Sequence, residues 1–228
     1  MSGGLVIREL EVDRGAGPVV SGVNLAIEPG TITAIVGPNG AGKTSLLEAI
    51  SGLLTSTRGA IEIDGEDIVK LSRRQRAARG LVHVEQNRAI FPSLTVRENL
   101  ELVNSDISAV LEAFPELDKR LTSAAGLLSG GEQQMVVLGR ALVATPKFLM
   151  IDEMSSGLAP VVVQRLLPIV ERFRDAGVGV LLVEQFAHLA LRIASRGIVI
   201  TSGQVTYSGA AAALLSDEAL LHRSYLGE

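Results

Sequence analysis

A glycine-rich octapeptide at residues 37–44 constrains this chain more than any other feature of its sequence. It follows an apolar run at residues 31–36, typical of a buried strand, and precedes residues 45–50, whose apolar side chains recur at helical spacing. Glycines in such a turn let consecutive backbone N–H groups converge on one anion, and the positive end of the following helix adds to that attraction. A strand, a glycine loop and a helix in this order form the context in which the motif binds nucleotide phosphates. The residues that we predict to bind ATP here are Gly37, Pro38, Asn39, Gly40, Ala41, Gly42, Lys43, Thr44 and Ser45.

The last two residues of the octapeptide have separate predicted roles. Lys43 is expected to reach the β- and γ-phosphates as a point charge, and the Thr44 hydroxyl to bind Mg²⁺. A second apolar run, residues 148–151, ends in Asp152 and Glu153. In open α/β sheets, ligands bind at the carboxyl ends of such buried parallel strands. We therefore predict that Asp152 holds the metal and that Glu153 accepts a proton from an attacking water.

A second motif, Leu-Ser-Gly-Gly-Glu-Gln at residues 128–133, has no function within a single nucleotide pocket. Ser129 is a favourable helix N-cap, and the two glycines after it allow the backbone to approach an anion closely. This segment matches the signature of ABC transporters, and the chain resembles their ATP-binding subunits from about residue 5 to its C-terminus. The resemblance implies that ATP is buried between two subunits. The residues that it places against the γ-phosphate of the opposite subunit are Ser129, Gly130, Gly131 and Glu132.

The same resemblance implies roles for three further residues. Gln86 would contact Mg²⁺ and the attacking water, and would signal the nucleotide state to the membrane partner. Gln185 stands where the family usually has a histidine that senses the γ-phosphate, and glutamine donates a hydrogen bond but carries no proton. His188, one helical turn on, is the alternative for that role. Arg14 stands where most members present an aromatic ring to adenine, and its guanidinium is able to stack on the base.

Two short sequences resemble one branch of the family. Residues 183–185 are Val-Glu-Gln and residues 157–160 are Gly-Leu-Ala-Pro, as in the second ATPase of importers of branched-chain amino acids and related amides. The implied partners are a second ABC ATPase subunit, identical or related, together with permease subunits and a soluble substrate-binding protein. A lipid or polysaccharide exporter remains an alternative, because the membrane subunits choose the cargo.

Non-transport members of the family are weaker alternatives. A DNA-repair ATPase carries a long coiled coil between the two motifs, and no heptad array separates them here. A translation-associated member usually holds two cassettes in one chain, and this chain has one phosphate loop.

The composition limits the location and the partners. The net charge of −4 gives no reason to expect nucleic acid as a partner, and the absence of cysteine excludes thiolate metal sites. The N-terminus does not resemble a signal peptide, and no apolar run has the length of a membrane helix. We therefore expect a cytoplasmic protein, peripheral on the inner face of the plasma membrane through its permease subunits.

The pattern of apolar residues predicts an α/β fold of the P-loop ABC ATPase type. Residues 1–228 are expected to form a single domain with a mostly parallel central sheet. Residues 5–12, 22–27 and 59–63 are predicted to form an antiparallel β layer, and residues 93–140 a helical insert. The basic run at residues 71–79 is expected to be a solvated helix face rather than a nucleic-acid site.

Overall fold

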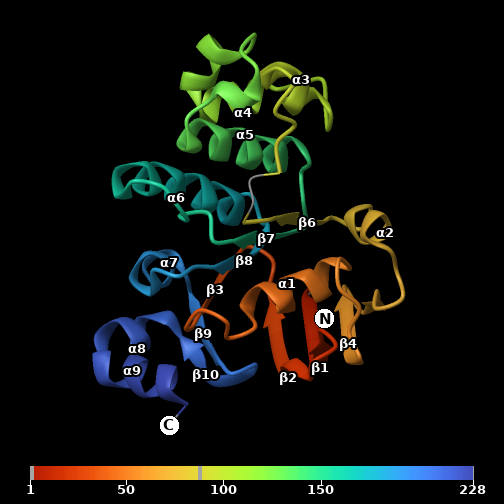
Figure 1. Cartoon of the computed structure of the whole chain (residues 1–228), viewed down its shortest axis with the longest axis vertical. Coiled ribbons are helices and arrows are strands. Elements are labelled where there is room, and N and C mark those ends of the chain that lie inside the picture. The colour runs from red at the N-terminus through yellow and green to blue at the C-terminus, as the bar shows by residue number, and fades with distance from the viewer. Residues whose placement is uncertain (1–2, 87–88, 228) are drawn as a thin grey trace.

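The computed structural model describes residues 3–86 and 89–227, and it contains two sheets (Figure 1). The smaller sheet is antiparallel, with strand order β2-β1-β4-β5. It confirms the predicted antiparallel layer and adds one short strand, β5. Its strands are β1 (Leu5–Asp13), β2 (Pro18–Ile27), β4 (Arg58–Ile63) and β5 (Glu66–Asp67).

The larger sheet has six strands in the order β10-β9-β3-β8-β7-β6. All neighbours in it are parallel except β10, which pairs antiparallel with β9 at one edge. Every residue of the central strands β3, β7 and β8 is buried, as the continuous apolar runs predict. The strands are β3 (Ile32–Val36), β6 (Leu81–Val84), β7 (Phe148–Asp152), β8 (Gly179–Val183), β9 (Arg196–Thr201) and β10 (Gln204–Ala210).

The helices lie in three places (Figure 1). Helix α1 (Lys43–Ser51) packs between the two sheets, and α2 (Arg73–Ala77) lies near the β6 edge. The predicted insert forms a group at the top of Figure 1, containing α3 (Val96–Glu101), α4 (Ser108–Ala113), η1 (Pro115–Arg120), η2 (Ala125–Leu127) and α5 (Gly130–Val143). The remaining helices follow the strands of the larger sheet: α6 (Pro160–Asp175), α7 (Ala187–Ile193), α8 (Ala211–Ser216) and α9 (Glu218–Leu226).

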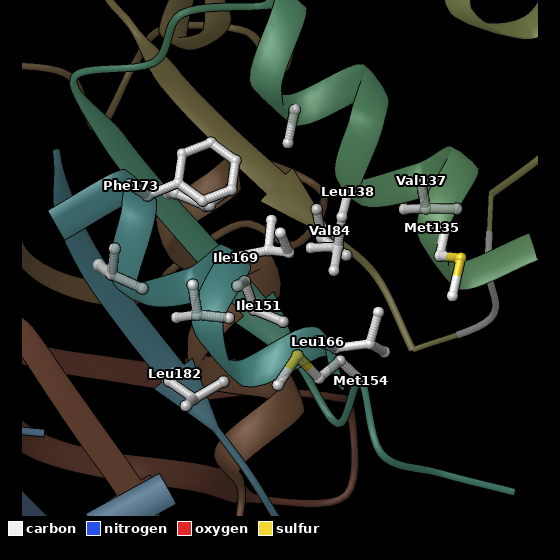
Figure 2. Packing of buried hydrophobic residues seen from close by; sticks show 14 of the residues in the cluster. Val84, Met135, Val137, Leu138, Ile151, Met154, Leu166, Ile169, Phe173 and Leu182 are labelled. Atoms are coloured by element: carbon white, nitrogen blue, oxygen red, sulfur yellow. The ribbon is translucent and has the colours of Figure 1, made fainter. Parts of the chain in front are cut away.

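Alternate side chains of the parallel strands enter two hydrophobic clusters on opposite faces of the larger sheet. On β7, Met150 joins the cluster that contains α1 and the antiparallel sheet, whereas Ile151 joins the cluster under α5 and α6. Figure 2 shows the second cluster, in which Leu138 of α5 and Leu166 of α6 pack among strand residues. Full burial of one such side chain is worth about 1.5–3 kcal/mol, so this cluster holds the helical insert against the sheet that carries the phosphate loop.

The basic run of residues 71–79 is mostly exposed, as predicted, with one exception. Arg76 is 4% exposed and does not lie on the solvated face. Its guanidinium donates hydrogen bonds of 2.7 Å to the carbonyl oxygens of Ala49 and Ile50 at the C-terminal end of α1, and others to Leu71 and Val69. The Ala49 and Ile50 carbonyls lie in the last turn of α1, where Ala49 also accepts the N–H of Gly52, and the negative end of the helix dipole favours a cation there.

Candidate active site

The phosphate loop connects the carboxyl end of β3 to the first residue of α1, as predicted. Two of its glycines are required by the neighbouring backbone. Gly37 has a φ of 149°, and an added Cβ would lie 2.0 Å from the carbonyl oxygen of Ile200. Gly42, the N-cap of α1, has a φ of 97°, and its Cβ would lie 2.3 Å from the carbonyl oxygen of Val19. The loop therefore holds its shape only with glycine at these positions.

Lys43 lies inside the loop, with 4% of its surface exposed. Its Nζ donates hydrogen bonds to the carbonyl oxygens of Gly37 at 2.9 Å and Pro38 at 3.0 Å. Burial lowers the pKa of Lys43, while the nearby carboxylates of Glu153 and Asp152 raise it. An ammonium group held by two carbonyls at the centre of the loop is positioned to meet a phosphate anion.

Two of the Mg²⁺ ligands predicted from sequence, Thr44 and Asp152, contact one another. Asp152 is 1% exposed and accepts a hydrogen bond from the Thr44 side chain. Within the described chain its Oδ1 is buried without a hydrogen-bond partner, and burial raises the pKa of this carboxyl to about 6. A buried carboxylate oxygen with an unused lone pair, next to a hydroxyl, suits a hard divalent cation. The residues present therefore fit Mg²⁺.

The described residues contain no group of three or more His, Cys, Asp or Glu side chains able to hold a metal. A pocket with so few protein ligands leaves most coordination positions to phosphate oxygens and water. Mg²⁺ is usually bound in this way at nucleotide sites.

Glu153 follows Asp152 and turns sharply away from β7. Its φ is 45°, in the left-handed region, which costs a residue other than glycine on the order of 1 kcal/mol. Its backbone N–H donates to the carbonyl oxygen of Val183 at 2.9 Å, and its Oε2 accepts a 2.7 Å hydrogen bond from Gln86 Nε2. Gln86 and Glu153, far apart in the sequence, therefore meet as a pair.

One pocket of about 390 Å³ unites most of the predicted site. Gln86, Glu153 and Gln185 line it from the carboxyl ends of β6, β7 and β8, opposite the phosphate loop. Ser156 and Val19 also line it. The family resemblance places Ser156 in a loop through which two subunits touch, and sequence reasoning assigned no role to Val19. His188 lines a neighbouring, mostly apolar groove with Phe186 and Pro160, and Gln185 lines both. The phosphate-loop residues that line the pocket are Asn39, Gly40, Ala41, Gly42, Lys43, Thr44 and Ser45.

Arg14 lies beside this pocket and is held by α1. Its Nε donates to Ser45 Oγ at 3.0 Å, and its terminal nitrogen pairs with Glu48. Its side chain is 45% exposed, and it is not among the residues that line the pocket. Stacking of Arg14 on adenine remains a prediction.

The signature segment lies outside the pocket, at the N-terminus of α5. Ser129 is the N-cap, with Glu132 N donating to its hydroxyl at 3.3 Å and Ser129 N donating to Glu132 Oε2 at 2.8 Å. Glu132 also accepts a 3.0 Å hydrogen bond from Arg120. Gly130 and Gly131 form the first turn, and none of these four signature residues lines the phosphate pocket of their own chain. This separation is what a segment acting on a second subunit requires.

Sequence reasoning missed one buried carboxyl next to the site. Glu184 ends β8 and is 1% exposed, and it accepts hydrogen bonds from Ser155 N at 3.2 Å and Ser155 Oγ at 2.5 Å. Burial raises the pKa of Glu184 to about 7, although the hydrogen bonds from Ser155 oppose that shift. The available signal was a glutamate directly after a wholly apolar strand, where its neighbours on both sides of the sheet enclose it.

The raised pKa of Glu184 predicts a pH-dependent stability. Because its ordinary value is 4.5, the folded protein keeps a proton that the unfolded chain releases as the pH rises from 4.5 towards 7. The free energy of unfolding should therefore fall across that interval and level off above it. We expect wild-type protein to lose on the order of 2–3 kcal/mol relative to Glu184→Gln between about pH 5 and 8, measured by urea unfolding. Parallel stability curves for the two proteins would contradict the raised pKa.

Known proteins with similar sequences agree with this geometry. Residues 20–156 match the ABC transporter family. The chain is 38% identical to the high-affinity branched-chain amino acid transport ATP-binding protein BraG of Pseudomonas aeruginosa, over 90% of this chain and 91% of that protein. It is 37% identical to the probable branched-chain amino acid transport ATP-binding protein LivF of Archaeoglobus fulgidus, over 86% and 87%. It is also 35% identical to the lipopolysaccharide export system ATP-binding protein LptB of Escherichia coli, over 92% and 91%.

Solved structures show the same architecture. An ATP-binding cassette of an ABC transporter in its ADP conformation matches all of this chain with a TM-score of 0.85 and 25% identity, and all of that chain is covered. A nucleotide-free cassette gives the same TM-score and identity over 96% of this chain and 97% of the other. The chain belongs to the ABC transporter family and is an ATP-binding, ATP-hydrolysing subunit. A search of the described residues finds no helix with the length and apolar character to cross a membrane.

Proposed function

We propose that ATP is hydrolysed in the pocket above Lys43, with Glu153 as the general base. The observation that carries this proposal is the meeting of Gln86 and Glu153 at 2.7 Å on the wall opposite the phosphate loop. A water molecule between that wall and a γ-phosphate bound at the loop would lie within reach of the Glu153 carboxylate. Gln86 fixes that carboxylate through its hydrogen bond and would orient the same water.

The metal in this proposal is Mg²⁺, held by Thr44, Asp152 and Gln86. When bound, it would offset the negative charge of the β- and γ-phosphates. Lys43 would bind the same phosphates from the loop, and Gln185 would donate a hydrogen bond to the γ-phosphate from the end of β8.

A second ATPase subunit, identical or related, would complete the pocket. Its Ser129 hydroxyl and the backbone N–H groups of α5 would bind the γ-phosphate, an anion suited to a helix N-terminus. Because these contacts need the γ-phosphate, ATP would favour the closed pair over the open one.

The membrane partners would dock beside Gln86. A groove of about 220 Å³ is lined by Glu85 and Ala89 near that residue, by Arg73 and His83, and by Val103 and Arg140 of the insert. A permease segment bound there would lie next to the residue that contacts Glu153. Bound to the permease in this way, the chain would be a peripheral protein on the inner face of the plasma membrane. Because Gln86 contacts Glu153, permease docking would also be coupled to the state of the bound nucleotide.

We infer that the transporter is an importer of branched-chain or related amino acids, working with a soluble substrate-binding protein. The support is the 38% and 37% identity to BraG and LivF, together with Val183-Glu184-Gln185 at the end of β8. The lipopolysaccharide exporter subunit LptB, at 35% identity, favours an exporter as the second candidate.

Uptake measurements in the native cell separate these two candidates. A strain without this chain, complemented with either wild-type protein or Glu153→Gln, is supplied with radiolabelled leucine, isoleucine or valine at low concentration. We expect uptake with the wild type and its loss with Glu153→Gln. Equal uptake in both strains, together with a loss of surface lipid or polysaccharide, would contradict the importer and support the exporter.

The proposed role of Gln185 predicts a gain of function. In Gln185→His, an imidazole able to carry a proton replaces an amide that cannot, so we expect turnover at saturating ATP to rise by on the order of tenfold. Phosphate release from purified protein measures this. His188→Gln should leave turnover unchanged, since His188 lies in another groove. An unchanged rate in Gln185→His, or a fall in His188→Gln, would refute the role given to Gln185.

A further inference from the structure

The buried carboxyl of Glu184 joins the two loops that carry the proposed catalytic residues. One of its oxygens accepts the backbone N–H of Ser155 at 3.2 Å and the other accepts the Ser155 hydroxyl at 2.5 Å. The backbone N–H of Gln185 also donates to this carboxyl. Three donors from two loops therefore converge on one side chain that is 1% exposed.

These donors lie at or close to the proposed catalytic residues in the sequence. Ser155 lies two residues after Glu153, and Gln185 directly follows Glu184. The strands β7 and β8 are parallel neighbours, with Asp152 opposite Val183. Beyond the strand ends, the backbone N–H of Glu153 still donates to Val183. The Glu184 carboxyl provides a second connection between the two loops, through Ser155, two residues beyond Glu153.

The Glu153 loop needs such a connection. Glu153 has a φ of 45°, which the chain does not adopt without restraint. Burying a carboxyl is also costly unless hydrogen bonds compensate it, so a buried glutamate in place of an apolar residue adds little to stability. Catalytic groups, by contrast, must be held within a fraction of an ångström of their productive positions.

We propose that Glu184 is a positioning residue that fixes the Glu153 loop relative to Gln185 through Ser155. It contacts no nucleotide and transfers no proton. Its effect on turnover comes from the geometry of its neighbours. The inference rests on the roles proposed above for Glu153 and Gln185.

The test compares Glu184→Ala, Ser155→Ala, the double variant and Ser155→Thr. Alanine at position 184 removes both acceptor oxygens, whereas glutamine would keep one and donate to the Ser155 hydroxyl. Both single variants should lower kcat for ATP hydrolysis by about tenfold or more and change KM for ATP by less than about twofold, because the phosphate loop is untouched. The double variant should be no slower than the slower single variant, because both changes remove the same contact. Ser155→Thr keeps the hydroxyl and should retain wild-type kcat. The controls are Glu218→Gln on the exposed start of α9 and Ser224→Ala, which removes a buried hydroxyl that donates to Leu220 and does not line the pocket.

Hydrogen exchange supplies a readout that does not depend on activity. In Glu184→Ala, the amides of residues 153–158 should exchange faster than in the wild type, while those of β1 stay unchanged. If Glu184→Ala does not fold, Ser155→Ala tests the same contact by removing only the hydroxyl oxygen. Wild-type kcat in the folded single variants, or additive losses in the double variant, would overturn the proposal.

Glu153→Gln, assayed in parallel, distinguishes a failure of the positioning role of Glu184 from a failure of the proposed base. If Glu153→Gln is slow while Glu184→Ala is normal, the positioning role fails and the proposed base stands. If Glu153→Gln hydrolyses ATP at the normal rate, the proposed base itself is wrong.

Discussion

Glu153→Gln should hydrolyse ATP at least about a hundredfold more slowly than the wild type and still bind it. The substitution removes the carboxylate that is proposed to accept the proton of the attacking water. It keeps an oxygen that accepts the 2.7 Å hydrogen bond from Gln86, so the pocket wall retains its shape. Steady-state phosphate release measures the first effect, and equilibrium binding of a fluorescent ATP analogue measures the second.

A matched control excludes a general effect of losing one negative charge. Glu101 lies at the end of α3 in the helical insert, away from the pocket, and Glu101→Gln should hydrolyse ATP at the wild-type rate. Near-normal hydrolysis in Glu153→Gln, with the control also normal, would remove Glu153 from the role of base.

Lys43→Ala should weaken ATP binding by about a hundredfold. The Lys43 ammonium is buried within the loop, and loss of one partner of a buried charge pair costs about 2–5 kcal/mol, or roughly 30-fold to several thousandfold in affinity. Isothermal titration with ATP and with ADP measures the loss. The deficit should be larger for ATP, because Lys43 is expected to contact the γ-phosphate as well as the β-phosphate.

Lys70→Ala controls for the loss of one positive charge, because Lys70 is exposed and does not line the pocket. It should bind ATP as the wild type does. Equal affinity of Lys43→Ala and wild type for ATP would show that the phosphates bind elsewhere.

The fold was largely predictable because buried parallel strands leave a strong pattern in the sequence. The runs that became β3, β7 and β8 are apolar at nearly every position. The edge strand β10 was not predicted. It contains Thr206, Tyr207 and Ser208 and is mostly half-exposed or exposed, so it lacks that pattern.

Two buried charged residues were not recognised from the sequence. Arg76 was expected on a solvated face, but it binds the C-terminal carbonyls of α1, a helix distant in the sequence. The partner of Glu184 is Ser155, which is contributed by the loop after the neighbouring strand β7. In both cases a polar side chain is stabilised by atoms that only the folded chain brings to it.

The candidate site, too, was only partly predictable from the sequence. Short motifs predicted the phosphate loop, Asp152 and Glu153, and the structure brings them together with Gln86 and Gln185. The signature at Ser129 is recognisable in the sequence, yet within one chain it lies outside the pocket. Its proposed function depends on a second subunit.

The most direct test of the account is therefore to identify what this chain binds when its pocket is closed. Tagged Glu153→Gln protein is trapped with ATP and Mg²⁺ in detergent-solubilised membranes of its own cell, and the co-purifying proteins are identified and compared with a sample without ATP. The account predicts hydrophobic permease subunits in both samples, with a second copy or a related ATPase held more tightly when ATP is present. Recovery of this chain alone, or of a complex without any membrane protein, would contradict its role as the ATPase of a transporter.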